Sequence, residues 1–110
     1  MSKVKNIKVT VDRKKWYRGQ SHEYSKLLLD NGKMCCIGFL ARELGCKPKE
    51  TRNQATLALV DSAHEFHDTY DDILASAYEV NDNPDITDDQ REKELTRLGK
   101  KMHVLFSFTN

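Results

Sequence analysis

The sequence predicts an α+β domain in which a small antiparallel sheet is covered by about three helices. Apolar residues alternate with polar ones over 7–11 and again over 104–108, which is typical of strands with one buried face. Between these two segments, apolar residues recur at helical spacings. Because two strands alone are marginal in water, we expect the first and last strands to pair beneath the helices, with the termini close together.

A predicted loop over 19–25 and a predicted turn over 30–33 precede the first helix. The run 34–44 is mostly apolar and small, which predicts a buried helix, and Gly45 follows where glycine often caps a helix. Pro48 fits the first turn of the next segment. The clearest amphipathic pattern predicts a long helix over 53–78, either continuous or broken once.

The last helix has a clear start signal. Thr87 and Gln90 match a capping box, in which each side chain bonds a backbone amide near the other residue. The turn residues at 81–85 precede it. This helix would place Leu95 and Leu98 inward and end at Gly99.

Length and charge limit the function classes. A chain of 110 residues is expected to form one domain over 1–110. Its 18 basic and 17 acidic residues give a net charge of +1, so no strong global field attracts nucleic acid or membrane. No apolar run has membrane-spanning length, and the N-terminus lacks the apolar stretch of a signal peptide. Three cysteines, an odd number, indicate a reducing compartment.

Cys35 and Cys36 are the candidate nucleophiles. They lie near the N-terminus of the predicted helix 34–44, where backbone amides and the helix dipole favour a thiolate. A cysteine-dependent hydrolase or transferase would also need a base. The competing interpretation is that both are buried small residues that allow close helix packing, and we favour it, so no catalytic residue is assigned. In the enzymatic alternative, the histidines that could act as the base are His22, His64, His67 and His103.

A metal site is a weaker candidate. His64 and His67 are three residues apart on the predicted long helix, and two histidines one turn apart can share a metal ion. The chain has neither a His-Glu-x-x-His run nor a Cys-x-x-Cys pair. We therefore favour a solvated helix face and assign no metal or other cofactor.

The basic N-terminal region supports an alternative function. Lys14, Lys15 and Arg18 surround Trp16, and cations beside an aromatic ring can hold a phosphate chain and stack a base. We favour a solvated segment with a core tryptophan over nucleic-acid binding.

Four residues are the candidate ligand-binding set. Trp16 and Arg18 belong to it because of their chemistry, and Asn81 and Asp82 because they end the long helix and can orient a ligand. For Asn81 and Asp82, capping and turn formation are the simpler explanation.

Several motifs occur in order along the chain: Trp16-x-Arg18-Gly19, Met34-Cys35-Cys36-Ile37-Gly38-Phe39, Val80-Asn81-Asp82, Ile86 to Glu92, and a final Val104-x-Phe106. This arrangement resembles a group of small uncharacterised proteins of tailed bacteriophages and prophages, which carry a Trp…Arg-Gly…Cys-Cys-Leu-Gly-Phe core and an Asn-Asp turn. The resemblance covers most of the chain except 47–76. Ile37 stands where leucine is usual.

The resemblance implies a phage-encoded protein made in the cytoplasm of a bacterial host. It implies no activity, so no catalytic role is carried over. The leading hypothesis is therefore a non-enzymatic binding module that engages a host protein or a small signalling ligand, for example in counter-defence. The residues leave the oligomeric state open.

Overall fold

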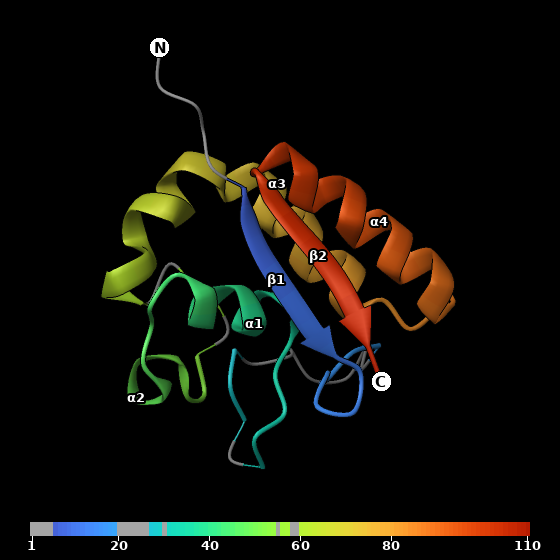
Figure 1. The fold of residues 1–110 in the computed structure, drawn as a ribbon, viewed down its shortest axis with the longest axis horizontal. Coiled ribbons are helices and arrows are strands. Elements are labelled where there is room, and N and C mark those ends of the chain that lie inside the picture. Colours follow the sequence, from blue (N-terminus) through green and yellow to red (C-terminus); the bar gives the residue numbers. More distant parts are fainter. Residues whose placement is uncertain (1–5, 20–26, 30, 55, 58–59) are drawn as a thin grey trace.

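Figure 1 shows a computed structural model of the protein, which describes residues 6–19, 27–29, 31–54, 56–57 and 60–110. Two adjacent strands lie against a group of helices, so the predicted α+β class is confirmed. In chain order the elements are β1 (Ile7–Asp12), α1 (Cys36–Glu43), α2 (Pro48–Thr51), the 3-10 turn η2 (Asp61–Ala63), α3 (His64–Asp82), α4 (Asp88–Lys101) and β2 (Val104–Thr109).

The two strands are parallel, so the predicted antiparallel pairing is wrong. Ile7 pairs with Val104 at one end of the sheet, and Asp12 pairs with Thr109 at the other. Figure 1 shows α4 running back along β2, which returns the chain to the end where β1 begins. The chain then reverses at His103, which has a positive φ of 59°. Both strands therefore start at the same end. Ile7 and Thr109 lie at opposite ends of the sheet, so the first described strand does not bring the start of the chain to its end as expected.

One face of the sheet is packed and the other is open. Val9 and Val11 are buried, as are Val104 and Phe106 of the neighbouring strand. In Figure 1, α1 lies beside β1, α4 lies beside β2, and α3 lies behind the strands. The polar residues between the apolar ones, including Lys8, Thr10 and Ser107, are exposed. The prediction of half-buried strands is confirmed.

Helix α1 confirms the predicted buried helix over 34–44, within two residues at its start. Gly45 follows with a φ of 90°, as a glycine cap requires. Gly38 is needed for a different reason. A β-carbon at this position would lie 1.9 Å from the carbonyl oxygen of Leu27 and 2.9 Å from Met34 Cβ. The absence of a side chain at Gly38 therefore lets the segment at Leu27 lie directly on the helix.

The long helix starts later than predicted. Instead of one helix over 53–78, α3 begins at His64, ends at Asp82 and is kinked at Tyr70, where φ is −124°. Tertiary pairing explains the difference, because 52–54 bonds to 27–28. Leu27 N donates to Gln54 O at 2.7 Å, and Asn53 N donates to Leu28 O at 2.8 Å. These hydrogen bonds hold 52–54 out of helical geometry despite the apolar spacing.

Helix α4 begins as predicted. Gln90 N donates to Thr87 Oγ1 at 3.1 Å and Thr87 N donates to Gln90 Oε1 at 2.9 Å, which completes the capping box. The predicted end at Gly99 is wrong, since the helix continues to Lys101. Gly99 instead makes room for β2, because a β-carbon there would lie 2.7 Å from the Phe106 ring. Most of the loop predicted over 19–25 lies outside the described residues.

Candidate functional site

Asn81, in the last turn of α3, is fully buried and joins three segments. Its Oδ1 accepts hydrogen bonds from Trp16 Nε1 at 2.7 Å and from the backbone N of Cys36 at 3.0 Å. Its Nδ2 donates to Tyr17 O at 3.1 Å and to Asp82 Oδ1 at 3.0 Å. Asn81 thereby connects α3 to the start of α1 and to the segment that follows β1.

Arg18 lies on the outer side of the same cluster. Its guanidinium carbon is 4.4 Å from the centroid of the Trp16 ring, and Phe108 is in contact with that ring at a centroid distance of 5.0 Å. Arg18 donates to the carbonyl oxygens of Arg13 and Trp16 and to Asp88 Oδ2 at 3.0 Å. The hydrogen bond from Arg18 to the Asp88 carboxylate is the main reason that the pKa of Asp88 is lowered.

Arg91 completes the cluster and is the member that sequence reasoning missed. It is 3 % exposed, and its guanidinium donates to the carbonyl oxygens of Val80, Asn81, Asn83 and Ile86. A cation at the end of α3 also complements the helix dipole. Its spacing could have indicated burial, because Arg91 lies four and seven residues before Leu95 and Leu98 and therefore on the same inward-facing side of α4. We call Trp16, Arg18, Asn81, Asp82 and Arg91 the Asn81 network.

The structure thus brings the four predicted binding residues together, but Trp16 and Asn81 lie inside the fold, while Arg18 and Asp82 are partly exposed. Trp16 is 3 % exposed and Asn81 is inaccessible. Their polar atoms already bond to the protein. The Asn81 network therefore fixes the packing of α1, α3 and α4 and leaves no open surface on Trp16 for a ligand.

Both candidate nucleophiles are buried at the start of α1. Cys35 occupies the N-cap position and Cys36 is the first helical residue. Burial raises the pKa of the Cys35 thiol to about 12 and outweighs the backbone hydrogen bonds, which lower it. Burial also raises the pKa of the Cys36 thiol well above its ordinary value. The helix N-terminus therefore does not produce the thiolate that nucleophilic catalysis requires. His22, one of the possible bases, lies outside the described residues.

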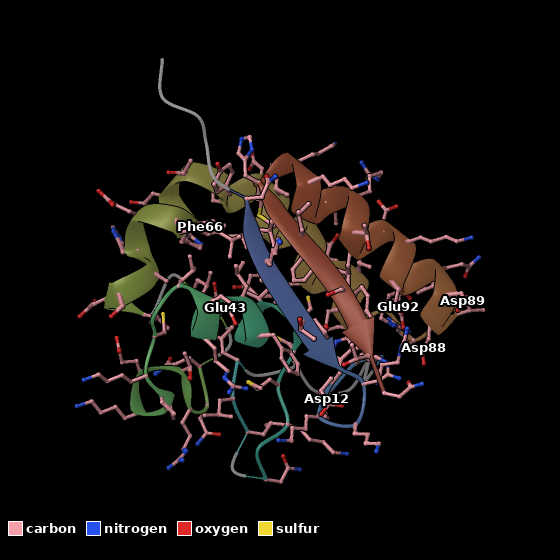
Figure 2. All side chains as sticks on the ribbon, viewed as in Figure 1. Asp12, Glu43, Phe66, Asp88, Asp89 and Glu92 are labelled. Carbon is pink, nitrogen blue, oxygen red and sulfur yellow. The ribbon has the colours of Figure 1, made fainter. Side chains whose placement is uncertain are left out.

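Two of the four cations in the basic segment after β1 pair with carboxylates of α4. Figure 2 shows Asp88, Asp89 and Glu92 together at the N-terminal part of that helix. Arg13 pairs with Glu92 at 2.8 Å, and Arg18 pairs with Asp88 at 3.0 Å. Lys14 and Lys15 are exposed, but the aromatic ring between the cations is covered. Base stacking on Trp16, which the nucleic-acid alternative needs, is therefore blocked.

The two candidate metal ligands face one carboxylate. His64 Nδ1 is 3.4 Å and His67 Nδ1 is 3.6 Å from the side-chain oxygens of Asp68. Within the described ranges, no group of three or more histidine, cysteine, aspartate or glutamate residues is arranged to hold a metal ion. The pairing fits a solvated helix face.

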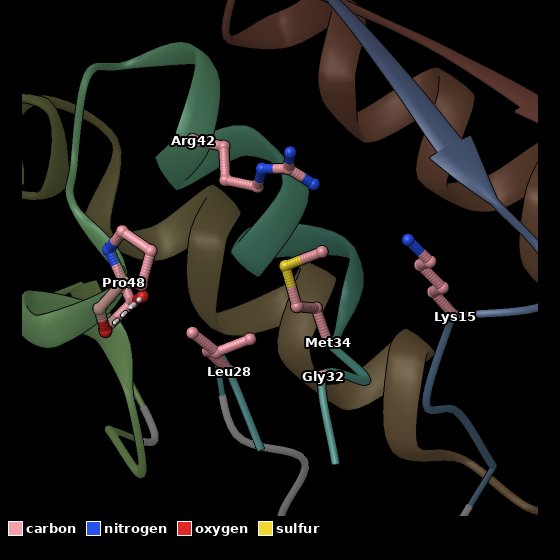
Figure 3. Close-up of a pocket in the computed structure, with 7 residues that line it drawn as sticks. Lys15, Leu28, Gly32, Met34, Arg42 and Pro48 are labelled. Carbon is pink, nitrogen blue, oxygen red and sulfur yellow. Dashed lines mark hydrogen bonds between the residues drawn. The ribbon is translucent and has the colours of Figure 1, made fainter. Parts of the chain in front are cut away.

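An open cavity with two cations at its rim lies on another part of the surface. It has a volume of about 160 Å³, and we call it the cationic pocket. Figure 3 shows Lys15 and Arg42 on either side of Met34, with Leu28 and Pro48 nearby. Among the described residues, the lining consists of Lys15, Leu28, Gly32, Met34, Arg42, Pro48 and Thr51.

Pairing between distant segments builds this pocket. Met34 N donates to Lys15 O at 2.9 Å, which sets Lys15 beside the start of α1. Leu28 pairs with Arg52 and so draws α2 to the opposite wall. The sequence analysis named Lys15 only as a nucleic-acid contact. It missed Arg42 because no local spacing links the two residues.

The described lining residues offer few kinds of reactive side chain. It carries no carboxylate, imidazole or thiol. The Thr51 hydroxyl donates to Pro48 O at 3.4 Å. The cationic pocket therefore offers positive charge and apolar contact, and it lacks the paired groups of nucleophilic or acid–base catalysis.

Comparison of the chain with family models, with curated proteins and with solved structures finds no match. No helix in the described part of the chain is both long enough and apolar enough to cross a membrane. The evidence for function is therefore the geometry of the chain itself.

Proposed function

We propose that this protein is a small phage-encoded accessory protein that acts in the cytoplasm of a bacterial host as a non-enzymatic binding module. The resemblance to phage and prophage proteins supports the origin, and the free thiols agree with a reducing compartment. Interference with a host defence signal is the role that we propose for the binding.

One observation carries the proposal of binding without catalysis. The side chains with the greatest chemical capacity, Cys35, Cys36 and those of the Asn81 network, are mostly buried and bond within the fold. The described lining of the cationic pocket, in contrast, presents accessible charge and no partner group for catalysis. Of a host protein and a small signalling ligand, the concave pocket favours the small ligand.

Thiol reactivity tests the competing enzymatic interpretation. With a pKa of about 12, Cys35 is almost entirely protonated near neutral pH, so we expect it to alkylate with iodoacetamide at least about tenfold more slowly than free cysteine. Cys36 should behave similarly because the same burial raises its pKa. Alkylation of the denatured chain is the control. A fast-reacting thiol in the folded protein would favour a hydrolase or transferase.

Native mass spectrometry of protein purified from a bacterial host without chelator tests binding itself. We expect an added mass from a ligand or partner, and we expect released ligand to be chemically unchanged after incubation with fresh protein. Folded Cys35→Ala and Cys36→Ala variants should retain the same added mass. Conversion of the ligand, or its loss in both folded variants, would contradict the proposal.

A further inference from the structure

We propose that the cationic pocket binds a small organic anion, consisting of a phosphate ester or carboxylate attached to an apolar group about the size of one ring. This inference rests on the proposed function, because it specifies what the binding module takes. The cations at the rim would hold the anionic group, and the apolar wall would hold the ring.

The charge state of the rim is the first argument. Four arginines elsewhere in the fold have a carboxylate partner: Arg13, Arg18, Arg91 and Arg97. In the described part of the chain, neither Lys15 nor Arg42 has a side-chain hydrogen bond or ion pair, and no acidic residue lines their pocket. Two cations with a common opening and no internal counter-charge form a site for an anion.

The identity of the cations narrows the kind of anion. The planar guanidinium of Arg42 presents paired N–H donors that match the two oxygens of a carboxylate or phosphate. Lys15 adds a compact ammonium that contacts a third oxygen or a neighbouring one. Figure 3 shows the two head groups flanking Met34, so an anionic group bound over Met34 would lie between them.

The apolar wall beneath the cations indicates that the ligand carries an apolar group beside its anionic group. Leu28, Met34 and Pro48 are apolar residues of this wall, and Met34 is 4 % exposed and belongs to the core. The volume of about 160 Å³ is close to the roughly 150 Å³ of a cavity that accepts benzene. A free phosphate would leave this apolar surface wet, whereas an aryl or short acyl group covers it.

The same features disfavour a long nucleic acid. A polyanion is held by a row of cations and by exposed aromatic rings, but here two cations flank a closed apolar wall and Trp16 is buried. The pocket is therefore shaped for one charged group with one attached apolar group.

Titration of the full-length ¹⁵N-labelled protein tests this inference, with phenyl phosphate and benzoate as the probes. A fragment of this size that fits should bind with a Kd of about 1 mM or tighter. We expect shifts of the Lys15, Gly32 and Arg42 amide signals and no shift at Gly99. Inorganic phosphate lacks the ring and benzyl alcohol lacks the charge, so each should bind at least about tenfold more weakly.

Two charge-removing variants locate the site. Lys15→Gln and Arg42→Gln keep an aliphatic stem with a polar but uncharged end, and both positions are exposed. We therefore expect the variants to fold normally, with a thermal denaturation midpoint close to that of the wild type. Each should weaken phenyl phosphate binding about tenfold or more. Lys93→Gln is the matched control, because Lys93 is an exposed lysine that lines a separate hollow between α4 and β2.

The outcomes separate this inference from the proposed function. Preference for phenyl phosphate over benzoate, or the reverse, identifies the anionic group and supports the site. Absence of binding by both probes, wild-type affinity in both Gln variants, or far tighter binding of a single-stranded oligonucleotide overturns the ligand class. A co-purifying ligand of another kind would still support a binding module. Release of phenol from bound phenyl phosphate would overturn the non-enzymatic function and leave the pocket assignment intact.

Discussion

At the scale of single residues, Asn81 shows how one buried amide fixes the relative positions of several segments. Its Oδ1 satisfies both the Trp16 indole and the first free amide of α1. A buried donor without a partner costs about 1–3 kcal/mol, so the role of Asn81 is to prevent two such losses. Aspartate has the same shape as asparagine but cannot replace it fully, because it lacks the Nδ2 group that donates to Tyr17 O.

Replacement of this amide should therefore be severe. Asn81→Ala leaves Trp16 Nε1 and Cys36 N without their acceptor, and we expect a loss of about 3 kcal/mol or more in the free energy of unfolding, measured by urea denaturation. Asn31→Ala, which removes an exposed turn hydrogen bond to Lys33 N, should cost less than about 1 kcal/mol. Equal losses in the two variants would show that the network is unimportant.

The residues on which the proposed resemblance to phage proteins rests have a structural role in this fold. Trp16, Arg18 and Asn81 form the Asn81 network, and Gly38 allows α1 to pack on the segment at Leu27. Two pocket residues, Pro48 and Thr51, lie in the stretch that the resemblance does not cover. The motif is therefore a better guide to the fold than to the ligand.

At the scale of elements, prediction succeeded where the signal is local. The capping box of α4 needs residues only three positions apart, and α1 has a continuous apolar run with a glycine after it. The start of α3 failed because the pairing of 52–54 with 27–28 depends on a contact between distant segments. The cationic pocket could not be predicted for the same reason.

Gly38→Ala tests the contact between α1 and the segment at Leu27. In this variant, the loss of that close contact and the gain in helix propensity have opposite effects on stability. Propensity alone would make alanine more stable by about 1 kcal/mol in the interior of α1. The new methyl group would instead collide with the carbonyl oxygen of Leu27, so we expect a net loss of about 2 kcal/mol or more. Ser76→Ala, at an exposed position of α3, should change stability by less than about 0.5 kcal/mol. A more stable Gly38→Ala protein in chemical denaturation would refute this packing.

At the scale of the whole molecule, the two ends of the chain form the sheet in parallel. Alternating apolar and polar residues report one buried face, and they do so equally for either strand direction. Parallel sheets are usually covered on both faces, whereas Lys8 and Thr10 leave one face of this parallel pair exposed. The direction is set by α4, whose packing along β2 returns the chain to the start of β1.

Engineered cross-links distinguish the two strand directions, because register decides which exposed positions are neighbours. Lys8 pairs with Leu105 in the parallel sheet. An antiparallel pairing of the two segments with alternating residues, 7–11 with 104–108, would instead place Lys8 opposite Ser107. We expect Lys8→Cys/Leu105→Cys to form a disulfide on mild oxidation, because paired Cα atoms lie within the roughly 4.4–6.8 Å that the bond needs. Lys8→Cys/Ser107→Cys is a diagonal pair in the parallel sheet and should stay reduced. The three native cysteines are buried and should not compete. Mass spectrometry of the oxidised, unreduced proteins reports the loss of two hydrogen atoms, and the reverse pattern would restore the antiparallel sheet.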